Sequence, residues 1–311
     1  MQVDVKELVV KGKPVTVTSI CIDDIELIVS GNYLRSAQIE GDWYKDIGDP
    51  QNLITTLKTS KVTVDIFTFL QKFPESDPKY KYYFEWDNLA AIPIKNYDYW
   101  FNEQIEKQSR NKIRKAAKMG VDVRMVDFND EFIRGMTDIF NEIPTRQGKK
   151  FWHYGKDFET IKQQFKKDSD KCDFIGAYYD HELIGFIWLF YGGGFARTTQ
   201  FLSKYRHRDK SSANALLAKA VEICSNKAIP YLLYGKFDYG KTGNVSLTDF
   251  KRHNGFKEIR LPRYYIPLTV KGRVILKLNL HHGIIGILPK KIINLLLDSR
   301  KKWYSRKMIN D

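Results

Sequence analysis

The sequence predicts an α/β (α+β) protein with two halves, each containing a mixed sheet, followed by a basic C-terminal segment. Three observations support this prediction. Apolar segments with strand-like patterns alternate with amphipathic helical segments along the chain. The 311 residues, 43% of them apolar, can fill one large or two ordinary domains. No repeat of about 20 to 50 residues appears. We place the halves at residues 1–120 and 121–270, and a tail at residues 271–311.

The first half reads as a mixture of strands and helices. Residues 13–22 and 25–31 predict strands, and residues 49–60 predict a helix opened by a proline. Residues 61–73 alternate like a strand buried on one side. The aromatic-rich segment 80–94 is more typical of a strand or loop than of a helix.

A helix is predicted over residues 97–119, ended by Gly120, and its second half is dense in cations. From Val121 onward the expected order is β, α, α, β, β, β, α, β, α, β. The clearest helix of the chain follows the three-strand run, with Ser211 or Ser212 as its N-cap. Its apolar positions have helical spacing: Ala213, Leu216, Leu217, Ala220, Val221 and Cys224.

Charge and cysteine content narrow the functional classes. The net charge of +14 indicates an anionic partner such as a nucleotide cofactor, a phosphorylated substrate, RNA or a membrane face. Three widely spaced cysteines have no metal-binding or CxxC pattern, which favours a reducing compartment. No signal segment or membrane-spanning segment is apparent, so we expect a cytoplasmic protein.

The predicted order of elements is that of the GNAT acyltransferase fold. In that fold, the turn before the central helix offers backbone N–H groups to the pyrophosphate of an acyl-CoA. The turn here reads SKYRHRDKSSAN, and Arg206, Asp209 and Ser211 occupy the signature positions, the last two where small residues are usual. An aspartate there would block and repel phosphate. Cations in the turn can still hold an anion, so the predicted donor-binding residues are Arg206, Arg208, Ser211 and Ser212; the alternative is a solvated basic turn.

Two further motifs, SRNKIRKAAKMGV (109–121) and SLTDFKRHNGF (246–256), together resemble the FemAB/FemX-like branch of this superfamily, over roughly residues 85–270. The resemblance implies two GNAT-like halves and transfer of an acyl or aminoacyl group to an amine. The chain lacks the long heptad-patterned arm of the tRNA-using members. The expected donors are therefore acyl-CoA, an acyl carrier and aminoacyl-tRNA, in that order.

The same resemblance suggests that Lys251 faces the reacting carbonyl, where a cation stabilises the developing oxyanion. Asp238 lies near the end of a predicted strand and would accept the amine proton directly or through water, and Tyr239 or Tyr234 would protonate the leaving group. The alternatives are a solvated helix face for Lys251, a turn former for Asp238 and rim packing for Tyr239.

Residues for binding the acceptor are predicted in two places. Strand alternation puts Glu85 and Asp87 on one face, opposite Trp86, which suits an amine acceptor. The cationic helix, with Arg110, Lys112, Arg114, Lys115 and Lys118, would line an anionic substrate channel, and Arg110 and Arg114 share one side of it. A charged strand face and a solvated helix face are the alternatives.

No metal site is predicted, because the histidines show no ligand spacing with one another, with cysteine or with a carboxylate. Among the six histidines of the chain are His153, His207, His253, His281 and His282.

The tail carries ten Lys and Arg against two Asp, or +8, and an apolar stripe of Ile292, Ile293, Leu296 and Trp303. We expect it either to bind a membrane surface, placing the protein peripherally at the inner face, or to pack on the body.

We therefore expect an N-acyltransferase whose acceptor is an amine or amino sugar of a cell-envelope or surface-polysaccharide precursor. The alternative is a non-catalytic binder of an anionic polymer or membrane on the same scaffold. The oligomeric state is left open.

Overall fold

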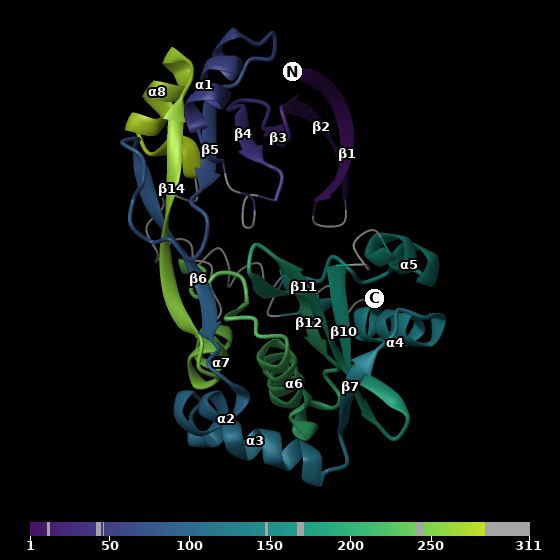
Figure 1. Cartoon of the computed structure of the whole chain (residues 1–311). Helices are drawn as coiled ribbons and strands as arrows, with labels where there is room; N and C mark the ends of the chain where they lie inside the picture. The colour runs from purple at the N-terminus through teal and green to yellow at the C-terminus, as the bar shows by residue number, and fades with distance from the viewer. Residues whose placement is uncertain are drawn as a thin grey trace. The chain divides into compact units, whose positions relative to one another are not determined.

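The computed structural model describes residues 1–10, 13–41, 45, 47–146, 149–166, 171–240 and 245–283. The chain divides into two units (Figure 1): the first is Met1–Asn88, Gly240–Thr242 and Arg260–Asp311, and the second is Leu89–Tyr239 and Gly243–Ile259. Both units contain helices together with parallel and antiparallel strand pairs, so the predicted α/β (α+β) class with mixed strand pairing is confirmed. The predicted boundaries at residues 120 and 270, which would separate two related halves, stay a prediction. The contacts within the structure divide the chain near residues 88 and 260.

The sheet of the first unit has the order β1-β2-β3-β4-β5-β14, antiparallel except for the parallel pair β4–β5. The predicted strands at 13–22 and 25–31 are confirmed, whereas β1 and β4 were not anticipated. The strands are β1 (Gln2–Val10), β2 (Lys13–Ile22), β3 (Ile25–Ser30), β4 (Ser36–Ile39), β5 (Ile66–Leu70) and β14 (Lys257–Pro267); the helices are α1 (Pro50–Thr59), α8 (Val270–Lys277) and the short η5 (Leu280–His282).

Helix α1 begins at the predicted proline, with the Asp49 side chain accepting the Gln51 N–H at 2.9 Å. Strand β5 departs from the prediction of one-sided burial, because all five of its residues are buried. Phe67 and Phe69 enter the core shared with α1, while Gly272 of α8 lies against Asp65 and Ile66. Helix α8, which the sequence patterns did not predict, accounts for the second buried face.

The strands of the second unit have the order β6-β13-β12-β11-β10-β7, antiparallel except for the parallel pair β12–β13, and residues 84–88 at the start of β6 belong to the first unit. The expected order from Val121 is confirmed, with a small hairpin β8–β9 added. The strands are β6 (Phe84–Pro93), β7 (Asp122–Val126), β8 (Thr145–Arg146), β9 (Lys149–Lys150), β10 (Cys172–Tyr179), β11 (Glu182–Gly192), β12 (Phe195–Ser203) and β13 (Tyr231–Leu233); the helices are α2 (Tyr97–Tyr99), η1 (Trp100–Gln104), α3 (Lys107–Lys118), α4 (Asp130–Asn141), α5 (Phe158–Lys166), η3 (Arg208–Lys210), α6 (Ser212–Asn226) and α7 (Val245–His253).

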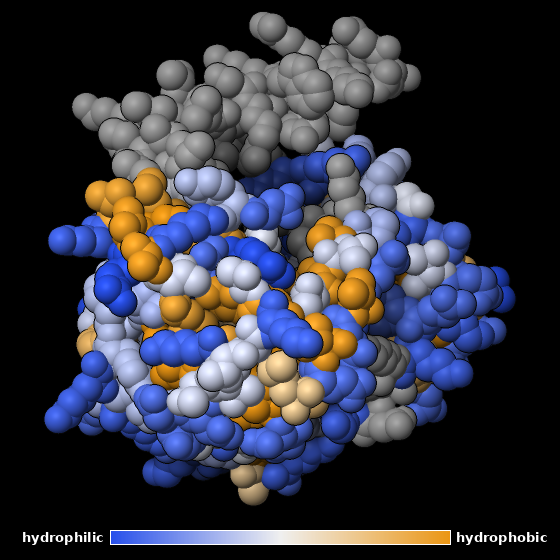
Figure 2. Space-filling model, turned by 90° about the horizontal axis from the view of Figure 1, so that it is seen from above, coloured by the Kyte–Doolittle hydropathy of each residue, from blue (hydrophilic) through white to orange (hydrophobic). Residues whose placement is uncertain are grey.

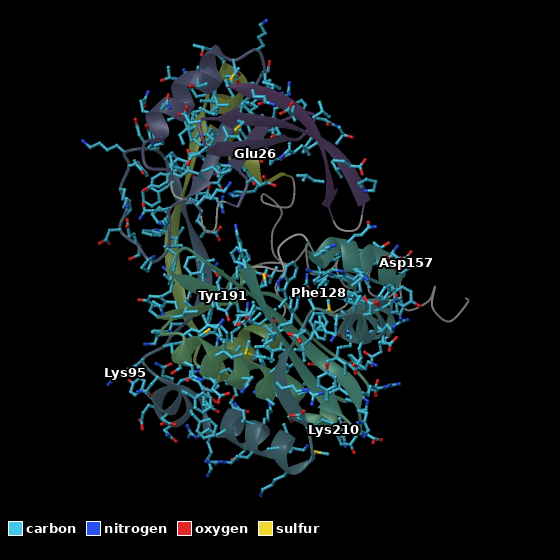
Figure 3. All side chains as sticks on the ribbon, turned by 45° about the vertical axis from the view of Figure 1, so that its right-hand side comes forward. Glu26, Lys95, Phe128, Asp157, Tyr191 and Lys210 are labelled. Atoms are coloured by element: carbon cyan, nitrogen blue, oxygen red, sulfur yellow. The ribbon has the colours of Figure 1, made fainter. Side chains whose placement is uncertain are left out.

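Both faces of this sheet are covered by helices (Figure 1). Strand alternation sends Phe174 and Phe186 toward α4 and α5, and Ile175 and Ile187 toward α6 and α3. Figure 3 labels Phe128, which stacks on Phe174 with ring centroids 5.0 Å apart at the edge of the first of these layers. The two layers hold the carboxyl ends of β12 and β13 in fixed positions.

The single helix predicted over 97–119 is wrong, because the segment is broken into α2, a π-helical turn η1 and α3. Trp100 is fully buried, and its indole N–H donates to the Asn254 carbonyl at 3.1 Å. Ile105 is extended (φ −93°, ψ 151°), and Arg110 donates to its carbonyl at 2.6 Å. The burial of Trp100 and the extended Ile105 therefore separate the two helical segments.

In the tail, α8 and η5 are described, and the predicted amphipathic helix after Pro289 lies outside the described residues. Among the helices that are described, none has both the length and the apolar character needed to span a bilayer. The face shown in Figure 2 is largely hydrophilic, with apolar side chains in separate groups between polar ones.

Candidate functional site

A pocket of about 370 Å³ lies in the second unit where the parallel strands β12 and β13 separate. The two strands pair only at Ala196–Leu232 and Arg197–Leu233, after which β12 continues to Ser203 without this partner. Residues at the carboxyl ends of both strands line the pocket: Phe201, Leu202 and Ser203 from β12, and Tyr234 after β13. Ligands in α/β proteins gather at the carboxyl ends of strands, and this volume lies within the usual range for ligand pockets.

The other walls come from helices and the turn before α6, and they are basic. The lining cations are Lys112, Arg146, Lys204 and Arg208, and no carboxylate side chain is among the lining residues. The remaining lining residues are Tyr205, Ser211, Ser212, Ala213, Asn214, Ser246, Leu247 and Phe250. The pocket thus combines a cationic, hydroxyl-rich side with an aromatic side.

The N-terminus of α6 opens on this pocket. Ser211 is the N-cap residue, as predicted, but it has φ +57° and its side chain makes no capping hydrogen bond. The first N–H groups of a helix have no partner within the helix and carry its positive dipole end, which suits an anion. Asp209 is not among the lining residues; it is 57% exposed and pairs with Lys210 at 3.4 Å. Lys210, labelled in Figure 3, also lies over the Tyr179 ring at 4.3 Å. Asp209 therefore does not block this pocket, contrary to the expectation from the sequence.

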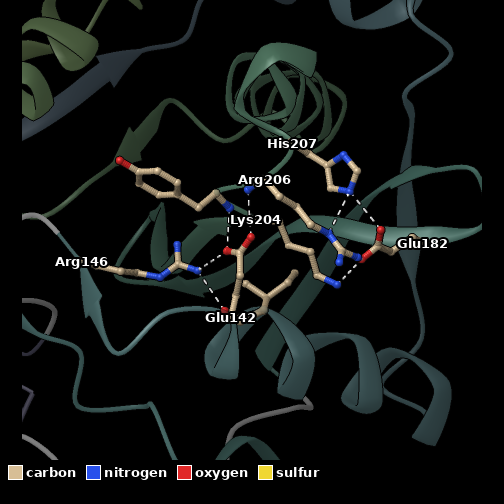
Figure 4. Close-up of polar contacts among 8 residues, drawn as sticks. Glu142, Arg146, Glu182, Lys204, Arg206 and His207 are labelled. Carbon is tan, nitrogen blue, oxygen red and sulfur yellow. Dashed lines mark hydrogen bonds and ion pairs between the residues drawn. The ribbon is translucent and has the colours of Figure 1, made fainter. Parts of the chain in front are cut away.

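Two carboxylates hold the turn before α6 (Figure 4). Glu142 accepts the backbone N–H groups of Tyr205 (2.6 Å) and Arg206 (2.9 Å) and pairs with Arg146 at 3.3 Å.

Glu182 pairs with Lys204, Arg206 and, at 3.0 Å, His207. Burial raises the pKa of Glu182, but these three donors outweigh it and lower the pKa to about 2. The carboxylate therefore stays ionised and holds the turn throughout the physiological range.

These pairs leave two pocket cations for a ligand. Arg146 and Lys204 are partnered by Glu142 and Glu182. Arg208 stacks on the Tyr205 ring at 3.6 Å, Lys112 is exposed on α3, and neither has an ion pair with another described residue. Burial lowers the pKa of Arg146, and the neighbouring charge of Arg208 adds to this. An anionic ligand would relieve the repulsion between these guanidinium groups.

Two buried polar atoms in the pocket wall also lack hydrogen-bond partners among the described residues: Ser203 Oγ and Arg146 Nε. Buried polar groups are almost always paired in folded proteins, so an unpaired donor in a pocket wall indicates a position for a ligand oxygen or a water.

Lys251, on α7 behind the aromatic side of the pocket, is fully buried. Its ammonium donates to the Lys236 carbonyl and lies 4.6 Å from the Tyr234 ring centroid and 5.1 Å from that of Tyr239. Burial lowers the pKa of Lys251 to about 8. Burial also favours the neutral form of Tyr234, so it raises the pKa of the Tyr234 hydroxyl. Lys251 thus does not line the pocket itself. It contacts Tyr234, which forms part of the pocket wall.

Solved structures share this arrangement of elements at low sequence identity. FemX matches with 11% identity over 88% of this chain and 90% of that chain (TM-score 0.51). L-PGS from Bacillus licheniformis matches with 13% identity over 84% and 88% (TM-score 0.56). The C-terminal domain of a protein described as a lysylphosphatidylglycerol synthetase, from Agrobacterium fabrum, matches with 10% identity over 85% and 88% (TM-score 0.56).

The chain therefore shares its fold with FemX and with L-PGS. No family model and no curated protein matches the sequence. At these identities the likeness concerns the fold alone.

The predicted donor residues are only partly brought together. Arg208, Ser211 and Ser212 line the pocket. Arg206 does not; it is 61% exposed and pairs with Glu182. Asp238 and Tyr239 are both exposed and are not among the lining residues, so their predicted roles stay predictions.

The predicted acceptor residues already have partners within their own units. In the first unit, Asp87 pairs with Arg263 at 3.2 Å, Glu85 contacts two histidines, and Trp86 is 52% exposed.

In the second unit, the Arg110 guanidinium donates hydrogen bonds to the carbonyls of Phe101, Asn102 and Ile105. The Arg114 guanidinium lies 5.5 Å from the centroid of the Phe101 ring. The Arg110 contacts give it a structural role at the end of η1. It is Lys112, from the same helix, that reaches the pocket.

Sequence reasoning missed Arg146 and Lys204 as pocket residues, whereas Tyr234 was predicted only as an alternative to Tyr239 for protonating the leaving group. Arg146 lies in a two-residue strand and Lys204 in a turn, and neither belongs to a periodic pattern. Lys112 was predicted only as one of five cations on this helix. Its helical phase, which separates it from Arg110 and Arg114, was the signal that could have singled it out.

Proposed function

We propose that the protein is a transferase that moves an acyl or aminoacyl group from an activated thioester or ester donor to an amine acceptor. The observation that carries the proposal is the basic pocket at the carboxyl ends of β12 and β13, which opens on the N-terminus of α6. The FemX-like fold supports it, since one relative is named for the synthesis of a lysyl-bearing phospholipid. The same resemblance suggests a cell-envelope or surface-polysaccharide precursor, such as an amino sugar, as acceptor.

The pocket suits the phosphate-bearing end of a donor. Arg208, Lys112 and the first N–H groups of α6 would hold the anion, while Phe201, Tyr234 and Phe250 offer an apolar side to the acyl part. We rank acyl-CoA first, an acyl carrier second and aminoacyl-tRNA third as donor.

The chemistry requires a base for the amine and a donor to the oxyanion. The amine nitrogen forms a bond to the acyl carbon, the carbon–sulfur or carbon–oxygen bond breaks, and the amine proton is taken up while the leaving group is protonated. In this proposal Lys251 supplies positive charge beside the aromatic wall, Asp238 accepts the proton and Tyr239 protonates the leaving group. Trp86 in the first unit and Arg114 in the second stay separate candidates for contacting the acceptor, since Glu85, Asp87 and Arg110 are engaged by the contacts described above. We propose a cytoplasmic location, with the tail at the membrane face.

Calorimetric titration of the full chain with CoA, acetyl-CoA, a long-chain acyl-CoA and aminoacyl-tRNA tests the donor site. Arg208→Ala and Lys112→Ala should each weaken donor binding about tenfold, as expected for one lost charge-assisted hydrogen bond. Arg134→Ala is the matched control, because Arg134 is also exposed and stacks on an aromatic ring, Phe158, at 5.1 Å. Lys115→Ala is the control on α3.

Equal affinity in the pocket and control variants would refute this donor site. Tight binding at the pocket with no transfer to any amine, tested with glucosamine and a peptidoglycan precursor, would favour the non-catalytic binder instead.

A further inference from the structure

Three side chains far apart in the sequence meet in the first unit: Glu85 near the start of β6, and the consecutive His281 and His282 of η5. Nε2 of His281 lies 2.9 Å from one Glu85 carboxylate oxygen, and Nε2 of His282 lies 2.6 Å from the other. One potential ligand atom from each residue falls within 4.8 Å of the other two. Both rings therefore present a nitrogen to the same carboxylate.

The neighbouring strands hold this cluster in place. The Tyr83 hydroxyl donates to Glu85 Oε1 at 3.0 Å, and the Tyr265 ring of β14 meets the His281 ring at 4.7 Å in an edge-on arrangement. Tyr83 and Tyr265 are themselves joined by a backbone hydrogen bond of 2.9 Å. A hydrogen-bond donor to a ligating carboxylate is the usual support that orients metal ligands.

Hydrogen bonding among the described residues does not satisfy the His281 ring. Its side chain is 2% exposed, and its Nδ1 is buried without a hydrogen-bond partner in the described chain. The centroids of the two imidazole rings are 4.0 Å apart.

We infer that Glu85, His281 and His282 bind one divalent transition-metal ion, for which Zn²⁺ is the test occupant. Two imidazoles and one carboxylate form a donor set that transition ions prefer to Mg²⁺ or Ca²⁺. Ligand atoms about 2.1 Å from a tetrahedral Zn²⁺ lie about 3.4 Å from one another, so the present contacts need to open by less than about 1 Å. Three protein ligands leave a fourth position for water or a ligand.

Such an ion would fasten η5 to β6 in the first unit. Helix α8, just before η5, is already anchored there, because Thr269 donates to Asp65 at 2.8 Å. The site is independent of the donor pocket, whose lining residues all lie in the second unit.

Cobalt titration of the untagged, metal-stripped full chain provides the test, because bound Co²⁺ absorbs visible light according to its coordination. We expect one Co²⁺ per chain, displaced by one Zn²⁺. Glu85→Gln and His281→Ala should each weaken Co²⁺ binding at least tenfold. His253→Ala is the matched control, since His253 lies 3.7 Å from Glu106 as a single histidine–carboxylate pair.

Where His281→Ala does not yield folded protein, His282→Asn replaces it, because the His282 side chain is 43% exposed. Zn²⁺ should also raise the melting temperature of the wild type but not of Glu85→Gln. Less than about 0.2 Co²⁺ per chain, or binding that Glu85→Gln and the histidine variants leave unchanged, would overturn the inference.

Discussion

Replacing Lys251 by Met should abolish a rise in stability that the wild type shows in alkaline solution. The Lys251 ammonium is fully buried, and its pKa falls to about 8 from the ordinary 10.5. Between these two values the unfolded chain binds more protons than the folded chain, so the free energy of unfolding increases with pH. Below pH 8 both states are protonated, and the contribution does not change with pH.

The size of the effect follows from the same shift. A difference of about 2.5 pKa units corresponds to about 3 kcal/mol gained between pH 8 and pH 10.5. At pH 7 the methionine variant should be within about 1 to 2 kcal/mol of the wild type, because removal of a buried charge is offset by loss of its hydrogen bond to the Lys236 carbonyl.

Urea denaturation of both proteins at pH 7, 8, 9 and 10 measures the difference directly, since all other titrating groups are common to both. Lys257→Met, which removes an exposed lysine, is the control and should follow the wild type. Stability curves that stay parallel for the wild type and Lys251→Met from pH 8 to pH 10 would refute the assignment of a buried, low-pKa lysine. We also expect Lys251→Met to lower turnover with little change in donor affinity.

Two further substitutions test the packing around the site and the tail. Glu182→Gln should lower the free energy of unfolding by about 1 to 3 kcal/mol at pH 7, because the carboxylate pairs with three basic side chains. Because the pKa of Glu182 is lowered, this loss of stability should shrink as the pH falls from 4.5 toward 2. Exposed Glu131→Gln is the control. Gly272→Ala should cost about 2 kcal/mol or more in urea denaturation, because its Cβ would overlap the Asp65 carbonyl, whereas exposed Val270→Ala should cost little. Equal stability of each variant and its control would contradict the corresponding contact.

The elements of the second unit were predictable because they have clear periodicity and clear ends. Strand β12 spans the predicted residues 195–203, and α6 carries the predicted apolar stripe into the core. Strands β1 and β4 were missed, since β1 has exposed apolar residues and β4 is only four residues long. The break at Trp100 depends on a contact with Asn254, which local sequence does not reveal.

The site was less predictable, because its side chains are selected by tertiary contacts. Lys251 and Arg252 are adjacent cations on one helix, yet Lys251 is fully buried while Arg252 is exposed and pairs with Asp249. Helical periodicity alone does not tell which of the two points inward. The histidine pair similarly gave no metal signal, because its carboxylate comes from Glu85, almost two hundred residues away.

The turn before α6 lacks the glycines of the signature, and its backbone N–H groups are used differently. A glycine turn offers backbone N–H groups to phosphate by close approach. Here Glu142 already accepts the N–H groups of Tyr205 and Arg206, so these two amides are not available to a donor.

Anion binding then depends on the α6 N-terminus and on the side chains of Arg208 and Lys112. Exposed side-chain charges are screened by salt more strongly than buried backbone amides. Donor affinity in this protein should consequently fall steeply with ionic strength, and most of that dependence should disappear in the Arg208→Ala, Lys112→Ala double variant.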